Sequence, residues 1–170
     1  MSVKGRKSDI VLLEVGLDSI DVHILQTLQE NARLSNTELA EMIGLSSSAC
    51  SRRLRRLEEE GWIEGYSAKI NARKIRLEVT AFVSVNIERH QNADAEAFMR
   101  SIRKLPEVIA CYIISGQSDF LLHVVVRDLD AYRAFTLEKL LKIPGVKDVR
   151  SAFAIGTVKP PSPLPLQQLR

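Results

Sequence analysis

The chain has 170 residues, of which 45% are hydrophobic and 26% charged, and its formal net charge is +3. This balance excludes a mainly disordered chain, and the length suggests one or two domains. No apolar run reaches the roughly 18 residues that a membrane-spanning helix needs. The short apolar start is broken by Asp9 and Glu14, which argues against a cleaved signal peptide.

The two cysteines, Cys50 and Cys111, lie far apart and belong to no CxxC or Cys/His cluster. We therefore expect no disulfide framework, no structural metal, no cofactor and a reduced cytoplasmic setting. Each cysteine is predicted to be a small buried hydrophobe.

Residues 17–61 have helical periodicity. Asp18 or Ser19 is suited to cap a first helix, whose apolar stripe is Ile20, Ile24, Leu25 and Leu28. Ser35 and Glu38 have the spacing of a capping box, so a second helix is predicted to begin there. Gly44 is suited to end it, because glycine tolerates the left-handed conformation.

A third helix is predicted to be capped by Ser46, to run to about Glu60 and to stop at Gly61. Three short helices with a brief Gly-containing turn before the last have the outline of a helix-turn-helix. On the third helix the apolar side chains face one way. The opposite face and its margins carry small hydroxyls and basic side chains, namely Ser47, Ser48, Ser51, Arg52, Arg55 and Arg56.

Arginine and serine are suited to base edges and phosphates in a DNA major groove. We predict that five residues face the groove: Ser47, Ser48, Ser51, Arg52 and Arg55. Arg53 and Arg56 are predicted to lie nearer the phosphate backbone. The alternative is an amphipathic surface helix whose Arg55–Glu59 and Arg56–Glu60 pairs have i,i+4 spacing.

The segment 62–76 is basic and contains Trp62, Ile63, Tyr66 and Ile70, with Gly65 between them. This pattern is compatible with a short hairpin or a connecting strand. We expect it to act mainly as a linker and hinge, with contact to DNA phosphate as an open alternative.

Beyond residue 77 the pattern predicts strands at 79–88, 108–114, 120–126 and 146–155, and helices at 93–105 and 129–141. The order βαββαβ predicts an antiparallel four-stranded sheet with two helices on one face, so the whole chain is α+β and its second domain is ferredoxin-like. The other face would be uncovered. Apolar residues such as Phe82, Ile114 and Leu122 would not remain in water, so we expect a homodimer formed through the sheet.

The tail from Lys159 to Arg170 contains four of the six prolines. Its first part is predicted to be extended and mobile, and its terminus to be frayed, with a proline-rich partner motif as the alternative.

The order and spacing of these motifs resemble a known family. The stretch LDSIDVHILQTLQENARLSNTELAEMIGLSSSACSRRLRRLEEEGWIEGY is similar to the DNA-binding domain of the Lrp/AsnC transcriptional regulators. The later stretches SGQSDFLLHV, DLDAYRAF and IPGVKDVRS resemble that family's regulatory (RAM) domain. The resemblance implies a winged-type helix-turn-helix domain, with the motif itself at 36–55, joined to a RAM domain. It also implies an amino-acid-responsive regulator of double-stranded DNA that forms dimers, often assembled into octamers.

The resemblance places the effector between subunits, near the turn that joins the second and third RAM strands. That turn holds Gly116, Gln117, Ser118 and Asp119, and Ala152 on the last strand corresponds to a position near the pocket in relatives. An amino acid needs an acceptor for its ammonium and N–H donors for its carboxylate. Asp119 and the turn backbone are suited to supply them. The alternative is that Gly116 and Asp119 only make the turn.

The expected organisation is a flexible basic arm (1–16), a DNA-binding domain with a linker strand (17–78), a RAM domain (79–159) and a Pro-rich tail (160–170). The expected location is the cytoplasm, on the nucleoid. Two other functions remain open. One is an effector-independent architectural DNA-binding protein. The other is an enzyme resembling the sirohaem decarboxylases, which share this architecture, although no phosphate-binding, metal or nucleophile motif occurs.

Overall fold

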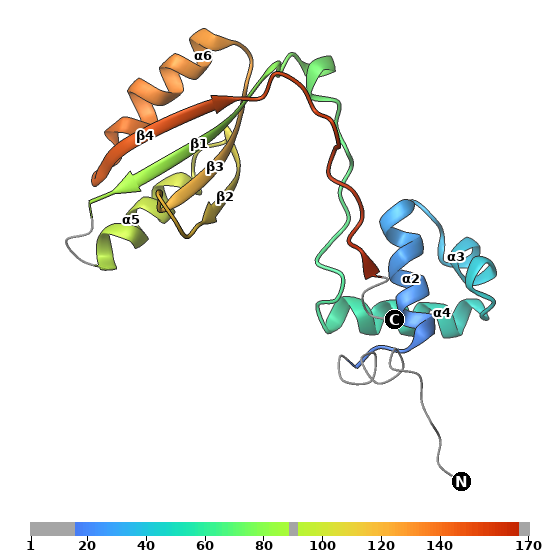
Figure 1. Ribbon diagram of the computed structural model, residues 1–170. Helices are drawn as coiled ribbons and strands as arrows, with labels where there is room; N and C mark the ends of the chain where they lie inside the picture. Colours follow the sequence, from blue (N-terminus) through green and yellow to red (C-terminus); the bar gives the residue numbers. More distant parts are fainter. Residues whose placement is uncertain (1–15, 89–91, 167–170) are drawn as a thin grey trace. The chain divides into compact units, whose positions relative to one another are not determined.

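The computed structural model describes residues 16–88 and 92–166 (Figure 1). The expected N-terminal arm lies, apart from its last residue, outside the described residues. By internal contacts the chain divides into two units. One contains the chain up to Ala68 together with the chain from Lys159, and the other is Lys69–Val158. The connecting segment after Ala68 thus belongs to the second unit by contacts, whereas the expected boundary was at residue 78.

The first unit is built from three helices: α2 (Ser19–Glu30), α3 (Asn36–Ile43) and α4 (Ser47–Glu59). Asp18, Ser35 and Ser46 cap them, as the sequence predicts, and the first two form reciprocal capping boxes with Asp21 and Glu38. Gly44 ends α3 at φ 76°, a left-handed conformation that a Cβ would strain. The turn before α4 therefore depends on glycine.

An apolar core holds these helices together. Its members are Leu17, Val22, Ile24, Leu28, Leu39, Ala40, Cys50 and Leu57. Each helix contributes at least two of them, so burial of this cluster fixes α4 against the other two helices. Cys50 is buried as predicted, and burial raises the pKa of its thiol.

The hairpin or connecting strand considered for 62–76 is not formed, because no described residue of this segment belongs to a strand. The aromatic residues are instead bonded to the end of α4. The Trp62 indole donates to Glu60 and the Tyr66 hydroxyl donates to Glu58, while the two residues remain 38% and 50% exposed. With no second strand to pair with, the segment runs as irregular chain to a short 3-10 turn at Ala72–Ile75.

The second unit contains β1 (Val79–Ile87), α5 (Asn92–Ile102), β2 (Val108–Ile113), β3 (Phe120–Val126), α6 (Leu129–Ala134) and β4 (Val146–Phe153). The strands form one antiparallel sheet in the order β2-β3-β1-β4. This is the predicted βαββαβ arrangement, and the strand bounds differ from the expected ones by at most two residues.

The predicted helix at 129–141 is interrupted. After α6 the chain forms a π-helix, η2 (Phe135–Lys139), and then a 3-10 turn, η3 (Leu140–Lys142). Phe135 and Leu140 are both buried against the sheet. In a regular α-helix, side chains five residues apart point about 140° away from each other. A π-turn, with its i→i+5 hydrogen bonds, brings them to the same face.

The two faces of the sheet are unequal. One is covered by both helices, and its core includes Val83, Val85, Leu122 and Val124 from the strands and Phe98 and Phe135 from the helices. The other face has no cover from the described residues of this chain. The prediction that Leu122 lies on the open face is wrong, because the strand alternation turns this side chain under the helices. Phe82 does lie on the open face and is 42% exposed.

Cys111 is exposed, contrary to prediction. It lies on β2, an edge strand whose large side chains Ile109, Tyr112 and Ile113 are also exposed. The helices therefore do not extend over this edge.

The first part of the tail is extended, as predicted, and the last four residues of the predicted frayed terminus lie outside the described residues. The described end of the tail docks on the first unit. The Leu164 backbone is bonded to the Gln29 side chain of α2, and Leu166 packs against the apolar core of the helices. No described helix is long and apolar enough to cross a membrane.

Candidate nucleic-acid interface and effector site

The exposed face of α4 is formed by Ser48, Arg52 and Arg55, which share i, i+4, i+7 spacing. Both arginines are exposed, and neither has a hydrogen-bond or ion-pair partner among the described residues. The alternative Arg55–Glu59 pair does not form. Two guanidiniums thus project from the helix with their donors available for a ligand.

The serines at the start of α4 differ in their local bonds. Ser47 is exposed. Ser48 is also exposed and lies 3.3 Å from the capping hydroxyl of Ser46. Ser51 is half-buried and accepts a hydrogen bond from the Asn36 amide at the start of α3. Ser51 therefore contributes to the α3–α4 contact as well as lying beside the arginine face.

Arg53 and Arg56 have partners inside the unit. Arg53 Nη1 lies 2.6 Å from Asp18 Oδ2 and 2.8 Å from Asp21 Oδ1, and Arg56 Nη2 lies 2.5 Å from Asp21 Oδ2. The Asp21 side chain is only 1% exposed. The Arg56–Glu60 pair of the alternative reading is thus replaced by a bond to α2. Arg53 Nη1 and Arg56 Nη2 are engaged by α2 and not by an outside ligand, so the geometry gives these two arginines a structural role.

This ion-pair network shifts two of its pKa values. Partial burial alone would raise the pKa of Asp18, but the Asp21 backbone N–H and the Arg53 guanidinium outweigh it and hold that pKa below its ordinary value. Hydrogen bonds to Asp18 and then Asp21 raise the pKa of Arg53. Asp18 and Arg53 are therefore both charged at neutral pH, as their ion pair requires.

In the second unit, the turn predicted to bind the effector joins β2 to β3. Gly116 has φ 118°, so the turn requires glycine there. Asp119 has several structural bonds: its carboxylate accepts the Ile87 N–H at 3.0 Å, and its own N–H donates to the Val85 carbonyl at 3.1 Å. Asp119 thus joins the turn to the end of β1, as the turn-only alternative anticipates.

Ala152 is not close to this turn within one chain. It pairs with Phe82 on β1, whereas Asp119 bonds to Ile87. These positions are five residues apart on β1, or roughly 16 Å at about 3.3 Å per residue. One subunit therefore does not bring all the predicted effector residues together.

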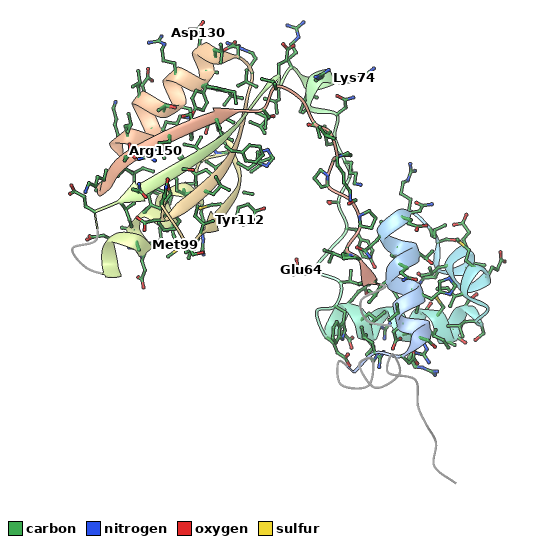
Figure 2. All side chains as sticks on the ribbon, viewed as in Figure 1. Glu64, Lys74, Met99, Tyr112, Asp130 and Arg150 are labelled. Carbon is green, nitrogen blue, oxygen red and sulfur yellow. The ribbon has the colours of Figure 1, made fainter. Side chains whose placement is uncertain are left out.

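An open cleft of about 750 Å³ lies beside Asp119 at this end of the sheet. It is lined by Asn86, Ile87, Asp119, Lys147, Asp148 and Arg150. Arg150 is paired with Asp148 at 3.1 Å, and Lys147 is exposed. Figure 2 shows Arg150 on β4 and Tyr112 on β2, the two edge strands. The cleft combines carboxylates and cations, the charges that a zwitterionic ligand needs. Within the described residues no His, Cys, Asp and Glu side chains gather as a metal site would require.

Comparison with protein families matches both units. A winged helix-turn-helix DNA-binding model matches residues 17–64, and a model of the Lrp/AsnC ligand binding domain matches residues 80–164. The chain belongs to the Lrp/AsnC family of DNA-binding transcriptional regulators.

Individual Lrp/AsnC relatives match along nearly their whole length. The Bkd operon transcriptional regulator of Pseudomonas aeruginosa is 41% identical over 150 residues, which cover 88% of this chain and 98% of the relative. The leucine-responsive regulatory protein of Escherichia coli is 40% identical over 143 residues, or 84% of this chain and 87% of that protein. A Neisseria meningitidis transcriptional regulator solved as an L-Met complex is 40% identical, with a TM-score of 0.87, and covers 91% of this chain and 99% of its own.

Sequence reasoning did not identify the partner role of Asp21 or the cleft residues Asn86, Lys147, Asp148 and Arg150. Asp21 carries only a local signal, an acid in the first turn of a helix. Its arginine partners are more than 30 residues away. Asp148 and Arg150 lie two residues apart on β4, so strand alternation places both on one face of the sheet. This spacing is the signal that could have indicated the cleft.

Replacing the buried carboxylate tests its role in holding α4. Removing one partner of a buried ion pair costs about 3–5 kcal/mol. Because the Arg53 and Arg56 side chains remain 28% and 40% exposed, we expect Asp21→Asn to lower the free energy of unfolding by about 2 kcal/mol. Urea denaturation followed by circular dichroism measures this. If Asp21→Asn unfolds at the same urea concentration as wild type, the network does not have this structural role. Glu41→Gln, which changes an exposed acid on α3, is the control.

Proposed function

We propose that this Lrp/AsnC regulator contacts the DNA major groove with Arg52 and Arg55, assisted by Ser47, Ser48 and Ser51. The observation that carries the proposal is the division of the four arginines. Two are paired with α2, and the other two are exposed and unpaired among the described residues. An exposed helix face with free guanidiniums and small residues is suited to approach base edges closely. Arg53 and Arg56 then serve DNA binding by positioning α4, and any phosphate contact of theirs is secondary.

Alanine substitution tests the two exposed arginines. Arg52→Ala or Arg55→Ala should weaken specific DNA binding by about 1–3 kcal/mol if the side chain is bidentate to guanine. Neither variant should lower the melting temperature, because neither side chain has a partner within the described fold. Fluorescence anisotropy with operator DNA measures the affinity. Arg100→Ala, an exposed arginine on α5, controls for lost charge. Wild-type affinity in both variants would exclude this recognition face.

We further propose that an amino acid modulates DNA binding from the β2–β3 turn and its adjoining cleft. The supporting observation is the mixed charge of the cleft, whose lining includes the carboxylates of Asp119 and Asp148 and the cations of Lys147 and Arg150, the charges that complement an ammonium and a carboxylate. The L-Met complex of the Neisseria regulator supports an amino acid as the ligand class. Gly116, Gln117 and Ser118 offer backbone and side-chain polar groups nearby, and Ala152 joins the site only from another subunit.

A thermal-shift screen with the twenty amino acids tests the effector. A ligand that binds only the folded state raises the melting temperature with concentration. We expect Lys147→Met to abolish the shift, whereas Lys142→Met, a neighbouring exposed lysine, should retain it. Asp119→Ala should also abolish the shift, and should lower the basal melting temperature because its carboxylate holds the Ile87 N–H. If no amino acid shifts wild type, an effector-independent architectural role becomes the better explanation.

The chain is proposed to form homodimers through the open face of the sheet, with octamers as the higher assembly. Phe82 and His123 stack on this face with ring centroids 4.8 Å apart, and Tyr112 and Leu121 are neighbours across β2 and β3. Desolvation lowers the pKa of His123, so its ring is neutral at pH 7 and compatible with an apolar interface. An exposed apolar patch of this kind in an antiparallel sheet is typical of a self-association surface.

A charge on this face should prevent the dimer from forming. Phe82→Asp places an unpaired carboxylate in the centre of the sheet face, and we expect it to convert the dimer to monomer at micromolar concentration. Sedimentation velocity measures the change. Leu129→Asp, at an exposed apolar position on α6, should remain dimeric. If Phe82→Asp sediments like wild type, dimerisation uses another surface.

A two-fold dimer predicts a nearly palindromic DNA site with half-sites about one helical turn apart, or a multiple of it. We propose that the protein acts as a regulator and not as an enzyme, and that it acts in the cytoplasm on the nucleoid. The support is that its relatives are named as transcriptional regulators.

A further inference from the structure

The C-terminal tail makes a specific contact with α2. Leu164 donates its backbone N–H to Gln29 Oε1 at 2.6 Å, and the Gln29 side-chain amide donates back to the Leu164 carbonyl at 3.4 Å. One side chain thus bonds both polar groups of one tail residue, as a neighbouring strand would. Two residues later Leu166 packs against the apolar core of the helices. Polar pairing and apolar burial together make this a docking site.

The composition of the tail favours such docking. Prolines at 160, 161, 163 and 165 fix φ near the extended value, so the tail loses little conformational entropy when it is held straight. Proline also lacks an N–H. Leu164, which stands between two prolines, therefore presents an isolated donor, and this is the donor that Gln29 accepts.

Between the sheet and the dock the tail is unpacked. The last bond to the sheet is from the Ala154 N–H to the Thr80 carbonyl. Ile155 and Val158 beyond it are fully exposed, and the next residue that is not exposed is Leu166. The segment is thus held at its two ends and free in its middle.

The two units are therefore connected twice. The first connection is the chain that leads from α4 into β1, and the second is the tail that leads from β4 back to α2. Because β1 and β4 are antiparallel neighbours with Ala81 opposite Phe153, both connections leave the same end of the sheet. A body attached by two chain segments has less freedom to turn than one attached by a single linker.

We propose that the C-terminal tail is a second tether of the DNA-binding unit, with Gln29 and the apolar surface under Leu166 as its dock. The tether limits the orientations open to the recognition helix. The two recognition helices of a dimer therefore lose less conformational entropy when they bind two half-sites. The inference rests on the proposed two-fold dimer. Binding to a single half-site uses one recognition helix, so it does not require the two helices of a dimer to be oriented relative to each other. Its affinity should therefore be independent of the tether.

The test uses the full chain and four variants. Gln29→Ala removes both hydrogen bonds to the Leu164 backbone, and Leu166→Ser removes the apolar contact with the helices. The controls are Glu30→Ala, an exposed neighbour on α2, and Leu164→Ser, whose side chain is 72% exposed in the docked tail. Amide hydrogen exchange of the peptide that contains 162–166 reports docking without DNA. Fluorescence anisotropy with two-half-site and single-half-site DNA reports the consequence.

Gln29→Ala and Leu166→Ser should speed exchange in the tail and weaken two-half-site binding about fivefold, with single-half-site affinity unchanged. The controls should match wild type in all three measurements. Unchanged tail exchange, or equal weakening on both DNAs, overturns the tether. Faster exchange with full two-half-site affinity also overturns it. If Leu166→Ser unfolds the helices, the result for Gln29→Ala alone decides whether the tether proposal stands. A wild type that binds neither DNA refutes the proposed function, while exchange still tests the dock.

Discussion

A single buried carboxylate organises the DNA-binding unit. Asp21 belongs to the first turn of α2, yet it pairs with Arg53 and Arg56 on α4. A carboxylate that is 1% exposed is stable only when it is paired, so burial of Asp21 requires α4 to present these two arginines toward α2. The helical repeat then turns Arg52 and Arg55 away from the core. The same bonds that stabilise the fold thus decide which arginines remain available to a ligand.

The two faces of the sheet are likewise divided between a buried set and an exposed set of side chains. Strand alternation places Val83, Val85 and Leu122 under the helices and leaves Phe82 and His123 on the uncovered face. The charged cleft lies at one end of that sheet, beside Asp119, and the chain enters and leaves the domain at the other. The proposed effector cleft and the connection to the helices are therefore at opposite ends of β1.

Local signals in the sequence predicted most of the fold, because caps and periodicity act over a few residues. Ser35 with Glu38, Gly44 and Ser46 set helix ends that the structure reproduces. Features that depend on distant partners were not predictable in this way. Asp21 needed its arginines and Leu164 needed Gln29, which is 135 residues away. The hairpin or connecting strand considered for 62–76 did not form, because apolar residues alone cannot supply a pairing strand. Cys111 was misplaced because edge position is a property of the assembled sheet.

The spacing of Ala152 and Asp119 along the sheet has a thermodynamic consequence. They are separated by five residues of β1, which no free amino acid spans. A ligand that touches both must therefore take them from different subunits. Its saturation would then depend on protein concentration, and by mass action the ligand would draw subunits together at dilutions where they otherwise separate. In a cell, the abundance of the regulator would set its sensitivity to the metabolite.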